Sequence, residues 1–166
     1  MYAAGDYVVR ANVGICQISD IGYPDFQTVK ERQLFYTLLP VGDSRTKLYI
    51  PVAPEPVGVR EVMNRNEALE LIRQMPDIQP IIIENEKLRE QQYRQALRSN
   101  DPRQLAAVIK VLYLRDKART AQGKKSVSVD SQYFQKAEKL LYSELAMALA
   151  VEVSEIPAYL QSAISE

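Results

Sequence analysis

The chain has 166 residues, enough for one domain or two small ones, and its 46% hydrophobic and 25% charged residues are typical of a soluble globular protein. Its 21 basic and 21 acidic side chains give a formal net charge of zero, which excludes a surface that is cationic throughout. The sequence has no histidine and a single cysteine, Cys16. Histidine-dependent catalysis, histidine-ligated zinc or haem, and an intramolecular disulfide are therefore excluded, and we expect no metal and no cofactor.

Residues 1–63 are predicted to form β structure, because short runs of β-branched and aromatic residues alternate with Gly, Pro and Asp turns. The predicted strands are Tyr7–Val9, Val13–Ile21, Gln33–Leu39 and Lys47–Val52. Several short strands with such turns favour a small, strongly bent antiparallel sheet or a barrel. Cys16 is expected to pack inside it as a small hydrophobic residue.

From Asn64 onward the hydrophobic residues recur with a helical period. Asn64 and Glu67 have the spacing of a capping box, and the segment 75–80, with two prolines, should end the first helix and mark the domain junction. The later helices are predicted from about Glu84 to Leu97, from Asp101-Pro102, from Asp130 or Ser131, and from Ser154 to near Ile164.

The predicted fold class is thus α+β with two small domains. A β domain spans residues 1–63, a connecting helix and linker span 64–80, and an all-α helical bundle spans 81–166. The N-terminal segment lacks the regions of a signal peptide, and the apolar run at 81–83 is far too short to span a membrane. We therefore expect a cytoplasmic protein without membrane contact.

Charge is distributed unevenly along the helical half. Residues 87–125 hold 11 basic and 3 acidic side chains, whereas the segment from 126 onward holds 2 basic and 6 acidic ones. A row of cations recurs every seven residues at Arg103, Lys110, Lys117 and Lys124. Such a surface can neutralise phosphates without reading sequence. The alternative interpretation is that these cations lie on solvent-exposed helix faces and bind no partner.

Several segments together resemble a known family. The segments are Gly5–Val9, Val13–Ile18, Lys47–Val52, Val57–Arg60, Leu112–Asp116 and Ala137–Ala148. In this order and spacing they resemble the CarD/CdnL family of bacterial transcription regulators, whose N-terminal domain is shared with transcription-repair coupling factors. The resemblance covers nearly the whole chain.

The resemblance implies a Tudor-like N-terminal domain that binds the RNA polymerase β subunit, and a helical domain that contacts the backbone of promoter DNA and modulates open-complex stability. It also implies a nucleoid-associated protein in the cytoplasm. Addition of an edge strand to a partner's sheet is one way to dock. The candidate polymerase-binding residues are Thr46, Lys47, Leu48, Tyr49 and Ile50. The candidate DNA-binding residues are Lys87, Arg89, Arg94, Arg98, Arg103, Lys110, Lys117, Lys124 and Lys125.

One departure from the family concerns an aromatic wedge. Some members carry a tryptophan at the start of the DNA-binding helices, where this chain has Glu84-Asn85-Glu86. Tyr93 and Tyr113 are the alternatives, but both are expected to pack in the core. The loop 121–129 is longer than in those relatives, and its Lys124-Lys125 pair could reach backbone phosphate.

Two other classes of function are alternatives. A non-catalytic adaptor would use the same basic helical face to bind an acidic protein partner rather than DNA. An enzyme is disfavoured because the sequence has no Gly-rich phosphate loop, nucleophile elbow or metal-ligand spacing, so we expect no catalysis and no small-molecule substrate.

Overall fold

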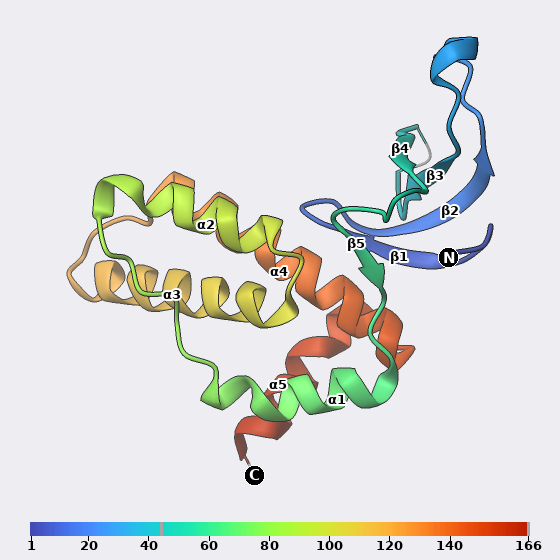
Figure 1. Ribbon diagram of the computed structural model, residues 1–166. Coiled ribbons are helices and arrows are strands. Elements are labelled where there is room, and N and C mark those ends of the chain that lie inside the picture. Colours follow the sequence, from blue (N-terminus) through green and yellow to red (C-terminus); the bar gives the residue numbers. More distant parts are fainter. Residues whose placement is uncertain (44, 166) are drawn as a thin grey trace. The chain divides into compact units, whose positions relative to one another are not determined.

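The computed structural model describes the backbone of residues 1–43 and 45–165, and the side chains of residues 1–43 and 45–162. The chain divides into two compact units, one comprising residues 1–62 and a second that begins at Met63. The first unit consists of strands and the short 3₁₀ turn η1 Val29–Glu31, and the second unit consists of helices (Figure 1). The predicted α+β class, with a bent antiparallel sheet followed by a helical region, is confirmed.

The N-terminal unit is one antiparallel sheet of five strands in the order β4-β3-β2-β1-β5. The strands are β1 Tyr7–Arg10, β2 Gly14–Gly22, β3 Phe35–Pro40, β4 Leu48–Pro51 and β5 Val59–Glu61. A register shift between Ile18 and Asp20 interrupts the pairing of β2 with β3. Such a bulge bends a strand and increases its twist, which helps this sheet to curl into a half-barrel.

One face of the sheet carries the core of this unit, because alternate residues along each strand point to the same side. Its buried side chains are Val8, Cys16, Ile18, Tyr36, Leu38 and Ile50. Cys16 is fully buried, as predicted, and burial raises the pKa of its thiol to about 11. The cysteine therefore serves as a small apolar side chain in the core.

The second unit contains five α-helices and three short 3₁₀ turns within the described residues. The helices are α1 Arg65–Gln74, α2 Arg89–Arg98, α3 Pro102–Ala121, α4 Ser128–Leu149 and α5 Ile156–Ser165. The turns are η2 Met75–Asp77, η3 Glu86–Leu88 and η4 Val153–Glu155. Figure 1 shows α2, α3 and α4 side by side, with the start of α2 at the same end as the loop that joins α3 to α4.

Two helix starts predicted from local signals are confirmed. Asn64 accepts a hydrogen bond from the Glu67 backbone N–H, and the Glu67 side chain accepts one from Asn64, which completes a capping box. Asp101 accepts a hydrogen bond from the Arg103 backbone N–H, with Pro102 as the first helical residue.

Two other predicted helix starts are wrong. The second helix begins at Arg89 rather than near Glu84, because Asn85 caps the separate turn η3 by accepting the Lys87 backbone N–H. The fourth helix begins at Ser128 rather than at Asp130 or Ser131. Asp130 is buried, and its carboxylate binds side chains from other helices instead of capping its own.

Helix α1 belongs to the second compact unit, whereas the sequence assigned residues 64–80 to a connecting segment. Its buried residues Ala68, Leu71 and Ile72 join the same core as Tyr93, Leu141 and Leu145. The buried Glu144 carboxylate on α4 accepts the Met63 backbone N–H at 2.9 Å, just before α1 begins. No helix in the described part of the chain is long and apolar enough to cross a membrane.

Candidate functional site

Strand β4 lies at one edge of the sheet and pairs only with β3 among the described strands. The Val52 backbone N–H donates to the Leu34 carbonyl at 3.0 Å. In an antiparallel ladder every second residue bonds to the same neighbour, so Ile50 and Leu48 also face β3. By that alternation, the backbone N–H and C=O of Tyr49 point away from β3. The predicted edge is therefore open, and it presents backbone groups that can pair with another strand.

The five predicted polymerase-binding residues divide by exposure. Thr46 and Lys47 are exposed, Leu48 is half-buried and Tyr49 is 42% exposed, whereas Ile50 is buried in the sheet core. Thr46 donates its hydroxyl to Asp43, and this hydrogen bond is the largest cause that lowers the pKa of that carboxyl. Ile50 therefore has a structural role, and the other four residues are accessible.

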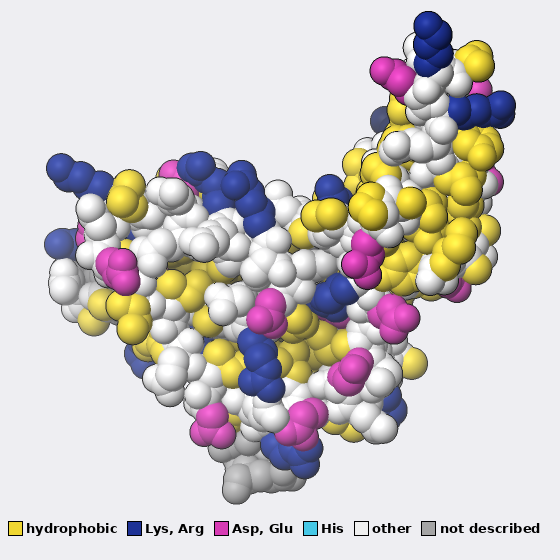
Figure 2. Space-filling view, viewed as in Figure 1, with side chains coloured by type: hydrophobic (Ala, Val, Ile, Leu, Met, Phe, Trp, Pro, Cys, Tyr) yellow, Lys and Arg dark blue, Asp and Glu magenta, His cyan; other side chains and the backbone are white. Residues whose placement is uncertain are grey.

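An aromatic cluster beside β4 was missed by the sequence analysis. The Phe26 ring lies edge-on to Tyr49, with the ring centroids 5.1 Å apart, and it contacts Phe35 in the same way at 5.7 Å. Phe26 is 62% exposed although it is apolar. Figure 2 shows hydrophobic side chains gathered over the drawn face of the N-terminal unit. The only sequence signal was an aromatic residue next to the turn at Gly22–Asp25.

Five of the nine predicted DNA-binding cations interact with their own chain. Arg89 and Arg115 both bind the buried Asp130 carboxylate, at 3.4 and 3.1 Å, and Arg115 also forms a bidentate pair with Glu86 at 2.6 and 3.1 Å. The hydrogen bond from Arg115 lowers the pKa of Glu86 and raises that of Arg115. This network joins η3, α2, α3 and α4, and three of its members, Glu86, Arg115 and Asp130, were not predicted.

Two cations of the seven-residue row bind the last residue of α1 and the segment that follows it. Arg103 donates to the Gln74 side chain. Lys110 donates to the carbonyls of Ile78 at 2.6 Å and Pro76 at 3.2 Å, and partial burial lowers its pKa. The spacing predicted a shared helix face, but it could not show that residues 74–78 pack on that face.

The two remaining engaged cations contact side chains that are at least partly exposed. Arg94 pairs with Glu90 at 3.0 Å and with the Tyr133 hydroxyl, and the hydrogen bond from Arg94 lowers the pKa of Glu90. Lys117 lies over the Tyr113 ring, with its ammonium 6.0 Å from the ring centroid. Both cations stay accessible, since weak surface contacts of this kind exchange readily with solvent.

Within the part of the chain that the structure describes, four predicted cations have side chains with no ion pair, hydrogen bond or ring contact: Lys87, Arg98, Lys124 and Lys125. The last two lie in the α3–α4 loop, where the Arg119 side chain donates to the Lys125 carbonyl at 2.9 Å. Figure 2 shows Lys and Arg over α2 and at this end of the unit, with Asp and Glu among them. On the face that Figure 2 draws, the cations therefore lie among acidic side chains rather than in a single continuous patch.

The two tyrosines named in the sequence analysis differ in exposure. Tyr93 is fully buried, as predicted, and burial raises its pKa to about 12. Tyr113 is 55% exposed on α3, so the prediction that it packs in the core is wrong. The described residues contain no group of three or more Cys, Asp or Glu side chains placed to hold a metal ion.

Comparison with protein-family models identifies both units. Residues 2–63 match the CarD-like/TRCF RID domain, and residues 67–161 match the CarD, C-terminal domain. The curled sheet fits a Tudor-like fold, and the combination defines a transcription-associated regulator that interacts with RNA polymerase. The chain belongs to the CarD family, whose members are non-catalytic regulators, and the predicted resemblance is confirmed. No curated protein matches the chain significantly.

Proposed function

We propose that this regulator binds the β subunit of RNA polymerase through the open edge of β4, contacts the backbone of promoter DNA through its helical unit, and thereby modulates open-complex stability in the nucleoid. The observation that carries the proposal is the open backbone edge at Tyr49 in a domain of the polymerase-interacting class. Strand addition provides affinity through backbone hydrogen bonds, and exposed side chains at alternate positions provide specificity.

The polymerase contact is tested by titrating the full chain with a fragment of the β subunit. Tyr49→Pro removes the outward N–H without removing a bond to β3, and we expect it to weaken binding about tenfold, at the upper end of what one such hydrogen bond contributes. Tyr49→Ala keeps the N–H and removes the ring, so a smaller loss is expected. Circular dichroism checks that both variants fold.

The outcomes are distinct. Wild-type protein that does not bind the fragment at low or moderate salt contradicts the polymerase contact. Binding by Tyr49→Pro at wild-type strength contradicts pairing through the β4 edge, even if the polymerase contact itself stands.

For DNA, we propose that Lys87, Arg98, Lys124 and Lys125, whose side chains have no internal partner, make the first phosphate contacts. The other predicted cations would contribute where they can exchange an internal contact for a phosphate. These are Arg89, Arg94, Arg103, Lys110 and Lys117. Because each neutralised phosphate releases counterions, duplex affinity should fall steeply with salt. Replacing Lys124 and Lys125 by alanine should reduce the slope of log affinity against log salt by about 2, at about 0.9 per phosphate.

Lys136→Ala with Lys139→Ala is the matched control, because both lysines are exposed on α4 outside the basic segment. This control should keep the wild-type slope. Absence of wild-type duplex binding at low salt would contradict the DNA contact and favour the adaptor, whose basic face binds an acidic protein. Equal slopes for all three proteins would place the contact elsewhere in the chain.

A further inference from the structure

A cavity of about 590 Å³ opens in the N-terminal unit beside β5, the strand at the edge of the sheet opposite to β4. It is lined by residues of β5, by Tyr36 of β3, by the first two residues of the chain and by most of the segment 52–57. We call it the β5 cavity. Its volume lies in the range of about 300–1,000 Å³ that ligand sites occupy, and the mouth of a curled sheet is a frequent place for such a site.

The segment that joins β4 to β5 forms one wall of the β5 cavity and is fixed by its own chain. Arg10 on β1 donates to the Val57 carbonyl at 2.8 Å and to the Gly58 carbonyl at 3.3 Å. Pro54 and Pro56 restrict the backbone of the same wall. A ligand that enters the cavity therefore has little of this segment to immobilise.

Two tyrosine rings line the β5 cavity from different parts of the unit. Tyr2 lies edge-on to Tyr36, with the ring centroids 5.7 Å apart, and the Tyr2 backbone N–H donates to the Tyr36 hydroxyl at 3.1 Å. Tyr36 is buried, whereas Tyr2 is half-buried, so part of the Tyr2 ring is accessible. The face of an accessible tyrosine ring attracts cations.

The charged side chains that line the β5 cavity are both acidic. Glu55 and Glu61 are exposed, and neither carboxylate has an ion pair or hydrogen bond within the part of the chain that the structure describes. Burial is the largest cause that raises the pKa of Tyr2, and the negative charges of Glu61 and Glu55 raise it further. Two carboxylates from different segments thus converge on one aromatic side chain.

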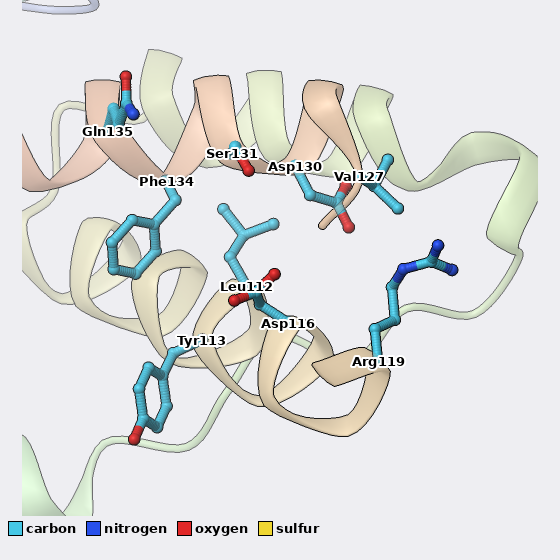
Figure 3. A pocket seen from close by; sticks show the side chains of 9 residues that line it. All are labelled: Leu112, Tyr113, Asp116, Arg119, Val127, Asp130, Ser131, Phe134 and Gln135. Carbon is cyan, nitrogen blue, oxygen red and sulfur yellow. The ribbon is translucent and has the colours of Figure 1, made fainter. Parts of the chain in front are cut away.

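The cavity between α3 and α4 differs in its charges (Figure 3). Its volume is about 360 Å³, and its charged lining residues are Asp116, Arg119 and Asp130. The Asp130 carboxylate is already bound to Arg89 and Arg115. A lining with charges of both signs favours neither a cation nor an anion, whereas the lining of the β5 cavity favours a cation.

The outer edge of β5 presents backbone groups beside the β5 cavity. The Ala11 backbone N–H donates to the Gly58 carbonyl at 2.8 Å, so by the alternation of the antiparallel ladder the N–H and C=O of Val59 point away from β1. Among the described contacts, neither group has a hydrogen bond. A residue of an added strand that lies opposite Val59 has its side chain on the same face as Val59, which lines the cavity.

We propose that the β5 cavity receives an arginine side chain of a partner protein, whose extended segment pairs with the outer edge of β5. A guanidinium can stack on Tyr2 and donate to the carboxylates of Glu55 and Glu61 at the same time, because it is planar and has five donors. Backbone pairing favours a protein over a free polyamine, which has no peptide groups. The contact lies at the edge opposite to β4 and is additional to the proposed polymerase contact.

The test titrates the isotope-labelled full chain with a pentapeptide that has a central arginine between β-branched residues, and follows backbone amide shifts by NMR. The shifts should centre on Tyr2, Val59 and Glu61. The same peptide with citrulline, a neutral side chain of similar shape, should bind about tenfold more weakly, since it forms no ion pair. A methyl group on the backbone nitrogen of the arginine should weaken binding several-fold, because it removes the hydrogen bond to the Val59 carbonyl.

A charge variant of the protein tests the same contact from the other side. Glu55→Gln combined with Glu61→Gln should bind the arginine peptide about tenfold more weakly than wild type, as two exposed ion pairs can contribute together. Asp20→Asn combined with Asp25→Asn is the matched control, because it removes the same charge at exposed positions of the N-terminal unit outside the cavity lining. The control should bind as wild type, and circular dichroism checks that both variants fold.

The outcomes decide between occupants. Equal binding of the arginine and citrulline peptides, wild-type binding by the double glutamine variant, or absence of shifts at Tyr2 and Val59 with millimolar peptide overturns the arginine site. Spermidine that matches the peptide in affinity and in shifts assigns the cavity to a free polyamine and overturns the protein partner. Loss of polymerase-fragment binding by the double glutamine variant makes the cavity part of the polymerase contact and overturns a separate partner. Failure of the polymerase contact at β4 leaves this inference standing.

Discussion

The N-terminal and helical units present their candidate contact surfaces by different means. In the first unit the surface is backbone, and its position follows from strand order, because β4 is the last strand of the sheet. In the second unit the surface consists of long cationic side chains, and five of the nine predicted ones interact with their own chain. A backbone edge is thus defined by topology alone, whereas a charged surface depends on which side chains are left without internal partners.

The largest expected effect comes from Leu38→Ala, which should damage the apolar core of the N-terminal unit alone. Leu38 is 1% exposed among the buried side chains of the sheet, and such a truncation costs about 3 kcal/mol. Hydrogen–deuterium exchange should accelerate in β1–β4, while α3 and α4 exchange at wild-type rates. Leu39→Ala at the half-buried next position is the control and should cost less than about 1.5 kcal/mol. Equal acceleration of exchange in both units would show that the two units unfold together rather than independently.

A somewhat smaller effect is expected from Asp130→Asn, which removes the charge at the centre of the network in the helical unit. The Asp130 side chain is 9% exposed, but Arg89 and Arg115 are 28% and 23% exposed and can regain water. The loss should therefore be about 2 kcal/mol, below the roughly 3–5 kcal/mol of a fully buried broken pair. Urea unfolding followed by circular dichroism measures it. Asp77→Asn, an exposed control, should change stability by less than about 0.5 kcal/mol, and a similar small value for Asp130→Asn would refute the structural role of the network.

The third prediction is a small pH dependence at Glu86. Arg115 lowers the pKa of this carboxyl in the folded chain, so its stabilising effect is complete above the ordinary carboxyl pKa and is lost as the pH falls through the lowered value. The difference in Tm between wild type and Glu86→Gln should be largest at neutral pH and should vanish in acid. Glu84→Gln, exposed two residues earlier, should show no such trend. A difference that grows on acidification would contradict the pairing.

The smallest effect is expected at Cys16, whose thiol should not react with a disulfide reagent in the folded protein. With a thiol pKa of about 11, roughly one molecule in a thousand carries the thiolate at pH 8, and the side chain is fully buried. A disulfide reagent should label the native chain negligibly and the urea-unfolded chain stoichiometrically. Rapid labelling of native protein would show that the sheet core opens readily.

Local signals predicted much of this fold. The cap at Asn64 and the Asp101-Pro102 helix start depend on neighbours within three residues, so the sequence alone was sufficient for them. Strands β1 to β4 were predicted close to their observed bounds, because β-branched runs and turn residues alternate. Strand β5 was missed, because it is short and its partner β1 lies far earlier in the chain. In the same way, the candidate edge at Lys47–Val52 contains the observed β4.

Long-range pairing explains what the sequence could not predict. Asp130 looked like a helix cap because its partners Arg89 and Arg115 lie 41 and 15 residues away. Arg103 and Lys110 looked free because the residues that they hold lie 29 and more residues earlier. Tyr113 directly follows the buried Leu112 of the apolar stripe, and its exposure depends on how α3 packs on α4.

The loop between α3 and α4 has a consequence for the kinetics of association. Gly123 adopts a φ of +72°, the backbone N–H groups of residues 122–124 donate to carbonyls at the end of α3, and Arg119 fixes the Lys125 carbonyl. The main chain that carries Lys124 and Lys125 is therefore ordered before a ligand binds. Binding then has to immobilise only the two lysine side chains. A ligand can then dissociate and rebind without the loop refolding.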